Sequence, residues 1–239
     1  MDRAIDYIRT LQPEAVEGLR PASDAEIDEL ESSRGIRFSE IHRTFLKRMG
    51  NGVGGLDFGP ADPTLAALRQ AFENTTGSPP PDCELFAVSG DDPYLDVFLL
   101  RRGEGEPAIG LAYSVFGGDF ESLDTEGMSI VAGSLSELLC HMPYVRARYE
   151  PKPLKFTLTN RQPVEGAMDR FDRVIRENGL ELVWFSTAMT RVAEFGETVL
   201  LAKQVPGTPL AVSIGTSNRI EFAAAHWWMT HDVGLEIAP

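Results

Sequence analysis

The sequence predicts an α+β protein in which an antiparallel sheet with helices packed on one side precedes a smaller α+β domain. Apolar residues at helical spacing and helix-capping signals dominate residues 1–82. Short β-rich runs separated by turn residues follow, to about residue 131. Pro151-Lys-Pro153 then breaks the chain, and the charge balance changes there. We therefore expect domains at 1–150 and 151–239.

Helix signals are clearest near the N-terminus of the chain. Residues 1–12 place apolar side chains on one helical face. Ser23-Asp-Ala-Glu26 has the form of a capping box, in which the two side chains satisfy each other's backbone amides. Gly35 is suited to end the helix that this box begins. A helix over about 23–35 is therefore predicted.

A second helix is predicted to begin at Ser39, whose hydroxyl can cap it. Its apolar positions are close to a 3.6-residue period: Ile41, Phe45, Leu46 and Met49. Gly50-Asn51-Gly52-Val53-Gly54-Gly55 follows, and such residues allow a sharp turn or a close backbone approach. The segment follows a helix and lacks Lys-Ser/Thr, so it is read as a structural turn and not as a phosphate-binding loop.

The rest of the first domain is predicted to be one more helix, a strand meander and a closing helix. The helical pattern lies within 62–82. The expected strands are 84–88, 94–100, 108–113 and 127–131. Ser134-Leu-Ser-Glu137 is a second capping box, which opens a Leu-rich helix.

The second domain reads as a strand, a helix and then further strands. The first strand is expected at 154–159, and the helix at 164–178 shows apolar steps of four, three and four residues. Further strands are expected at 180–185, 191–194, 197–203, 210–214 and 233–237. Residues 216–230 favour neither helix nor strand.

The net charge of −14 is concentrated in the first domain. Residues 1–150 hold 26 acids and 13 bases, whereas residues 151–239 hold 10 acids and 9 bases. Such a field repels nucleic acid, whose binding depends on Lys and Arg at phosphates. It accelerates encounter with a basic partner. The alternative is that the acids only keep the protein soluble.

Three features predict a cytoplasmic location. The sequence has no run of about 18 apolar residues that would span a membrane. Its first 15 residues mix acids and bases, unlike a secretory signal. Cys83 and Cys140 lack metal-ligand spacing and fit reduced, buried thiols. We expect no membrane contact and no cofactor.

Residues 23–59 carry an ordered motif: Glu31, Gly35, Phe38-Ser39, Phe45-Leu46 and Asn51-Gly52. This pattern resembles the SUKH superfamily, which includes Smi/Knr-type fungal regulators of cell-wall synthesis and many bacterial immunity proteins. Ser39 stands where that family usually has Pro, and Ser can also begin a helix. The resemblance covers about residues 20–142 and leaves 151–239 unexplained.

The resemblance implies a non-catalytic binding domain, and in bacteria an immunity protein that neutralises a toxin, such as a nuclease, by direct contact. A basic toxin surface would complement the acid-rich segment 82–126. The proposed binding residues are Asp91, Asp92, Asp96, Asp119, Glu121 and Asp124. A regulatory scaffold of the Smi/Knr kind is the alternative, and the oligomeric state stays open.

A hydrolase or metal enzyme is the alternative from a different class. His226 and His231 are five residues apart, and Asp232 is adjacent. Helical metal pairs prefer a spacing of four, and no third ligand group is evident in the sequence. Trp227-Trp228 between them suggests a buried or interface aromatic cluster instead. Neither paired carboxylates nor a Ser or Cys nucleophile has the sequence context of a catalytic group.

Overall fold

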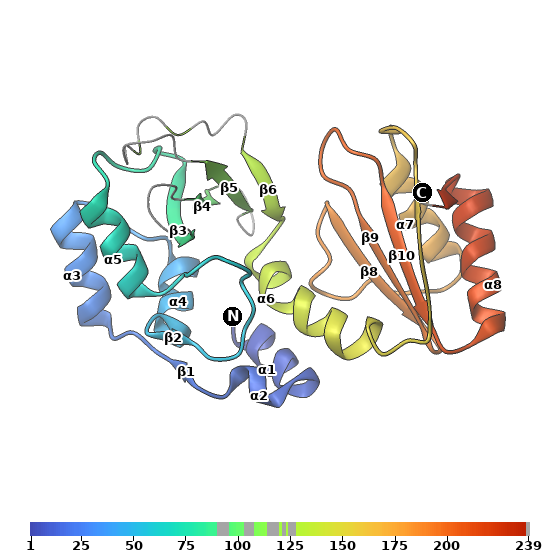
Figure 1. Ribbon diagram of the computed structural model, residues 1–239, viewed down its shortest axis with the longest axis horizontal. Helices are drawn as coiled ribbons and strands as arrows, with labels where there is room; N and C mark the ends of the chain where they lie inside the picture. Colours follow the sequence, from blue (N-terminus) through green and yellow to red (C-terminus); the bar gives the residue numbers. More distant parts are fainter. Residues whose placement is uncertain (90–95, 103–107, 114–119, 121–122, 124–127, 238–239) are drawn as a thin grey trace. The chain divides into compact units, whose positions relative to one another are not determined.

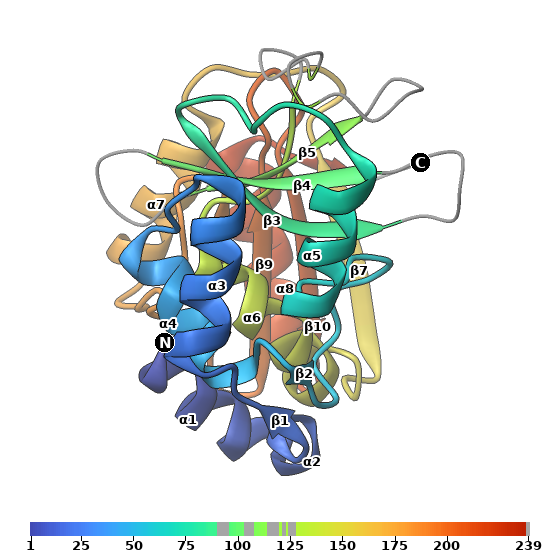
Figure 2. The same cartoon turned by 90° about the vertical axis from the view of Figure 1, so that its left-hand side faces the viewer.

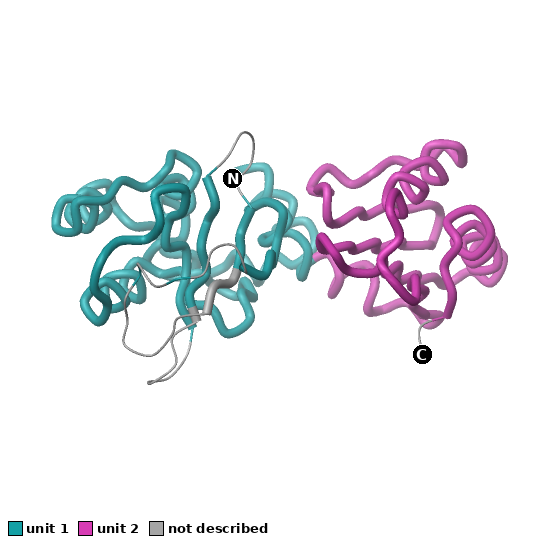
Figure 3. The backbone as a smooth tube through the Cα atoms, turned by 90° about the horizontal axis from the view of Figure 1, so that it is seen from above, with its two compact units in different colours: residues 1–143 teal, residues 144–239 magenta. Residues whose placement is uncertain are grey.

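The computed structural model describes residues 1–89, 96–102, 108–113, 120, 123 and 128–237 (Figure 1). Helices and antiparallel sheets are mixed, which confirms the α+β class. The chain forms two compact units, 1–143 and 144–239 (Figure 3). The division therefore falls seven residues before the boundary expected from the sequence.

Unit 1 begins with helices that follow the predicted pattern closely. They are α1 (Asp2–Leu11), α2 (Pro13–Val16), α3 (Asp24–Arg34), α4 (Glu40–Met49) and α5 (Leu65–Asn74). The capping box at Ser23 is present in full, and Gly35 ends α3 with a φ of 65°. Ser39 caps α4 by accepting from the His42 amide. α2 was not expected; Pro13 is its first residue, a position that proline tolerates well.

The strands of unit 1 form two antiparallel sheets. β1 (Leu19–Arg20) pairs with β2 (Gly52–Val53). β3 (Cys83–Ser89), β4 (Asp96–Arg101), β5 (Ile109–Tyr113) and β6 (Ser129–Ala132) pair in sequence order. α3 contacts both α4 and α5 beside this larger sheet (Figure 2). α6 (Leu135–Tyr144) begins directly after Ser134, whose hydroxyl accepts a hydrogen bond from the Glu137 amide.

The glycine-rich segment after α4 is a close-packed turn. Only Gly54 among its glycines has a positive φ, of 60°. A Cβ added there would lie 2.7 Å from the Glu17 carbonyl oxygen and 2.9 Å from that of Ala15. Glycine is therefore needed at Gly54 and Gly55 because the backbone around α2 passes against them.

Unit 2 consists of one five-stranded antiparallel sheet and two helices that supply side chains to its core. Its strands are β7 (Leu154–Thr159), β8 (Thr190–Phe195), β9 (Thr198–Lys203), β10 (Ala211–Thr216) and β11 (Glu236–Ile237), in the order β11-β7-β10-β9-β8. α7 (Ala167–Glu177) and α8 (Arg219–Trp227) are the helices. Two π-helical turns complete the unit: η2 (Val145–Tyr149) and η3 (Trp228–Val233).

The expectation of a strand at Leu180–Phe185 is wrong. Leu182 forms one isolated bridge with Ala193, and the Val183 amide donates to Val192. The chain then turns, because the Ser186 amide donates back to the Val183 carbonyl. β-rich composition was not sufficient here, since the segment lies at the edge of the sheet and turns before a ladder forms.

Candidate functional site

The Glu84 carboxylate is a buried acid of unit 1 that contacts Ser39, His42 and Arg102. Glu84 lies in β3 and is 4% exposed. Its Oε2 is 3.1 Å from Nδ1 of His42, and the Ser39 amide donates to it at 2.9 Å. Because an ionised carboxylate only accepts, the Nδ1 atom of His42 carries the hydrogen. These bonds hold the start of α4 against β3.

Arg102, the residue directly after β4, completes this network. Its Nε donates to Oε1 of Glu84 at 2.9 Å, and its Nη2 donates to the Arg37 carbonyl at 2.8 Å. Burial alone would raise the pKa of the Glu84 carboxyl, but the hydrogen bond from His42 and the other donors outweigh it. The pKa of Glu84 is consequently lowered from its usual value.

A pocket of about 310 Å³ adjoins the Glu84 network. Its walls are mainly apolar, and they include Ile36, Phe38, Phe72, Pro80 and Leu85. Cys83 and Arg102 also line it. Such a pocket can receive an apolar side chain of a partner, with a cationic group at its wall.

Cys83 is not activated as a nucleophile in this pocket. Its side chain is buried and free of any disulfide. Burial, reinforced by the nearby Asp82 carboxylate, raises the pKa of the Cys83 thiol to about 11. A thiol with that pKa is protonated near neutral pH, whereas reactive cysteines have lowered pKa values.

The motif residues that carry the family resemblance act as structural residues. Glu31 is buried and accepts from the Phe38 amide at 2.8 Å and from Arg43 at 2.6 Å. The Asn51 side chain donates to the Pro21 carbonyl and to Glu26, both at 3.1 Å. Phe45 and Leu46 are fully buried, Gly35 adopts the left-handed conformation, and Gly52 pairs with Arg20. The motif therefore joins α3, α4 and the two-stranded sheet of β1 and β2.

Arg43 of α4 contacts three carboxylates of α3. It lies 2.7 Å from Asp28, 2.6 Å from Glu31 and 3.3 Å from Asp24. These contacts, the one to Asp28 foremost, raise the pKa of Arg43. The Lys47 ammonium lowers the pKa of the Asp24 carboxyl. Three of the five acids of α3 thus contact cations of α4.

Most of the proposed acidic binding residues lie outside the described residues. These are Asp91, Asp92, Asp119, Glu121 and Asp124. Asp96 is the first residue of β4, and its backbone pairs with Ser89 and Tyr113.

Described residues border two of the acidic segments in the sequence. Ser89, the residue before segment 90–95, is the last residue of β3. Phe120, by contrast, is buried, its amide donates to the Thr76 carbonyl, and its ring lies 5.6 Å from that of Phe72. Phe72 also lines the pocket with Cys83, at the start of β3.

The His226, His231 and Asp232 group does not form a metal centre. His226 packs 5.4 Å from Phe156, whereas His231 is exposed and stacks 5.0 Å from Trp227. Among the described residues, no three His, Cys, Asp or Glu side chains come together in a way that could hold a metal ion. Trp228 packs on Phe195, so the expected aromatic cluster is present at that residue.

Sequence reasoning missed the residues that the structure connects most strongly. His42 and Glu84 are 42 positions apart, and Arg43 reaches Asp28 across 15 positions. One sequence offers no local signal for such pairs.

None of the helices in the described part of the chain is long and apolar enough to cross a membrane. Comparisons with protein-family models, with curated proteins and with solved structures returned no match.

Proposed function

We propose that this chain is a non-catalytic protein-binding module of the immunity type, which neutralises a toxin by direct contact. The partner is a basic protein, such as a nuclease, and the acidic segments of unit 1 provide the contact surface. The resemblance to the SUKH superfamily belongs to this proposal. Cytoplasmic action on a toxin inside the cell is part of it as well.

The charge distribution in unit 1 is the observation that carries the proposal. At least seven of the eleven Lys and Arg residues in 1–143 form ion pairs with described acids. The segments 90–95, 103–107, 114–119, 121–122 and 124–127 hold eight acids and neither Lys nor Arg. These segments therefore hold eight of the 25 acids of residues 1–143 and none of the eleven Lys and Arg residues, and we take them as the contact surface. Opposite charge on a partner would accelerate association and reject wrong partners.

The chemistry of the buried groups supports a binding role over a catalytic one. Glu84 and His42 are withdrawn from solvent and hold each other in place. Cys83, the thiol at the pocket wall, has a raised pKa. A catalytic acid, base or nucleophile needs access to substrate and a pKa matched to its task. These groups instead explain how β3 and α4 stay together.

Co-expression with the product of the neighbouring gene tests the proposal. We expect the two proteins to co-purify, and cells that express the neighbouring gene to recover growth when this chain is present. A regulatory scaffold would co-purify without restoring growth. Failure of both results would contradict the proposal.

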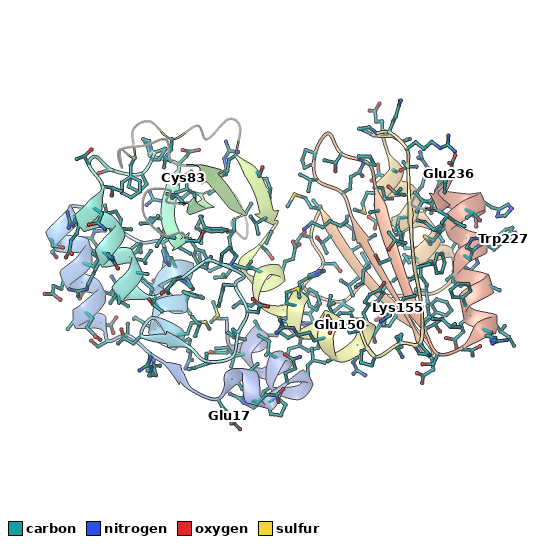
Figure 4. The ribbon with its side chains drawn as sticks, in the orientation of Figure 1. Glu17, Cys83, Glu150, Lys155, Trp227 and Glu236 are labelled. Atoms are coloured by element: carbon teal, nitrogen blue, oxygen red, sulfur yellow. The ribbon has the colours of Figure 1, made fainter. Side chains whose placement is uncertain are left out.

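A pair of charge variants localises the contact. Asp91→Asn with Asp92→Asn removes two charges from an acidic segment. Glu14→Gln with Glu17→Gln removes two exposed charges near α2 and is the matched control; Glu17 projects from the edge of unit 1 (Figure 4). We expect the first pair to slow association and the control pair to leave it near the wild-type rate.

A further inference from the structure

The two helices on the unit 2 sheet differ in their outward faces. Both supply core residues, among them Phe171 of α7 and Ala225 of α8. The outward residues of α7 are charged, including Asp169 and Arg173. Charged residues are the usual covering of a helix that faces water. The outward face of α8 is built differently.

Apolar residues occupy the outward face of α8 at helical spacing. We call Ile220, Ala223, Ala224 and Trp227 the α8 stripe. Ile220 is 81% exposed and Trp227 is 51% exposed, and Figure 4 shows Trp227 pointing away from the sheet. The spacing i, i+3, i+4, i+7 is that of a face buried against another element. With Ala225 already in the core, α8 is apolar on two faces, as a buried helix is.

We propose that the α8 stripe binds the α8 stripe of a second copy of this chain, in an antiparallel helix pair. The stripe reads almost the same in both directions: a large residue, two alanines, a large residue. When two copies cross at the alanines, Ile220 of each lies level with Trp227 of the other. The small alanines let the backbones approach, and the twofold arrangement is self-complementary.

Charge also favours a second copy as the occupant. Residues 144–239 contain 11 acids and 11 Lys or Arg residues, so unit 2 is balanced. Unit 1 carries the whole net charge of −14. A strongly basic partner would be drawn to unit 1, whereas two neutral units meet without like-charge repulsion. The surface best suited to self-association is therefore on unit 2.

His231 prepares Trp227 for this contact. The two rings stack at 15° with centroids 5.0 Å apart, and Nδ1 of His231 lies 3.1 Å from the Trp227 carbonyl oxygen. An indole that is already held in position loses less conformational entropy on binding. The stripe has four residues, whereas a standard interface buries about 20–30 residues on each partner. The expected dimer is therefore weak, with a dissociation constant of about 10–100 μM.

Sedimentation equilibrium on the full chain, from about 1 μM to about 1 mM, tests the proposal. We expect the mass to rise from that of one chain, 26.3 kDa, towards twice that value. Ala223→Glu should shift the dissociation constant upward at least tenfold. Ala66→Glu is the matched control, because Ala66 is an exposed helical alanine in α5. Equal thermal melting of the variants would show that the fold is kept.

Cross-linking tests the antiparallel geometry. Ala223→Cys places a thiol at the crossing point and should give a disulfide-linked dimer on mild oxidation. Asp232→Cys should not, since the two copies of that residue lie more than about 20 Å apart in an antiparallel pair. Cross-linking at both sites would overturn the antiparallel pair. A single-chain mass at every concentration would overturn the dimer. An Ala223→Glu variant that associates like wild type would overturn the α8 stripe as its interface.

Discussion

Nδ1 of His42 lies 3.1 Å from Oε2 of Glu84, and both side chains are buried. The imidazole is enclosed by aromatic rings, with Phe38 at 4.5 Å and Phe86 at 5.6 Å between centroids. In the described part of the chain, Nε2 of His42 has no hydrogen-bond partner. The pair thus connects α4 to β3 through one strong polar contact inside an aromatic cluster.

Replacing Glu84 should destabilise unit 1. Glu84→Gln removes the charge that accepts from Arg102, His42 and the Ser39 amide. Because the Arg102 side chain is 46% exposed, its charge is not left buried, and the loss of these charge-assisted hydrogen bonds should cost about 1.5–3 kcal/mol. Urea unfolding would measure this, with Glu73→Gln as the control, because Glu73 is exposed on α5. The control should stay within about 0.5 kcal/mol of wild type. Equal stability of the two variants would disprove the role given to Glu84.

The lowered pKa of Glu84 predicts a loss of stability in acid. Its ordinary value is 4.5, and the folded value is lower. The stabilisation is therefore complete above about pH 4.5 and is lost as the pH falls through the folded pKa. Unfolding free energy measured from pH 6 to pH 3 should fall more steeply for wild type than for Glu84→Gln. Parallel curves for the two proteins would contradict this assignment.

Cys83 should react slowly and should destabilise the fold in alkali. With its pKa raised from 9.0 to about 11, the thiolate at pH 8 is about 100-fold scarcer than in a free cysteine. Alkylation at Cys83, followed by peptide mass spectrometry, should be slower than in urea by at least that factor. A raised pKa stabilises the fold fully below pH 9, and this contribution is lost as the pH rises towards 11. Rapid alkylation of the folded protein would be inconsistent with this environment.

Gly54→Ala should cost more stability than Gly35→Ala. Both glycines have positive φ, at 60° and 65°. A Cβ at position 35 meets open space, whereas one at position 54 lies 2.7 Å from the Glu17 carbonyl oxygen. The conformational cost alone is about 1 kcal/mol, and the backbone contact adds to it at Gly54. Thermal or urea unfolding of the two variants would measure both losses of stability. Equal losses in the two variants would refute the predicted order.

The parts of the fold that depend on neighbouring residues were predictable. The Ser23 capping box, the Gly35 helix end and the helical period of α4 are local signals, and each was confirmed. The structure of segment Leu180–Phe185 was not predictable, because it depends on contacts with β8. Residues 216–230 were ambiguous for a physical reason. α8 is apolar on two faces, so its sequence lacks the polar side that marks a surface helix.

The candidate site was harder to predict, because its contacts join distant residues. Glu84, His42 and Arg102 come from separate elements, and only folding brings them together. The acidic segments were recognised from composition alone. Their role as a contact surface stays a prediction.

The salt dependence of association tests the central claim most directly. Once the neighbouring gene's product co-purifies, its association rate constant with this chain can be measured by stopped flow between 50 mM and 500 mM salt. We expect the rate to fall at least tenfold across that range, as electrostatically steered encounters do. The fall should be smaller for Asp91→Asn with Asp92→Asn, and unchanged for Glu14→Gln with Glu17→Gln. A rate that does not respond to salt would contradict an acidic binding surface.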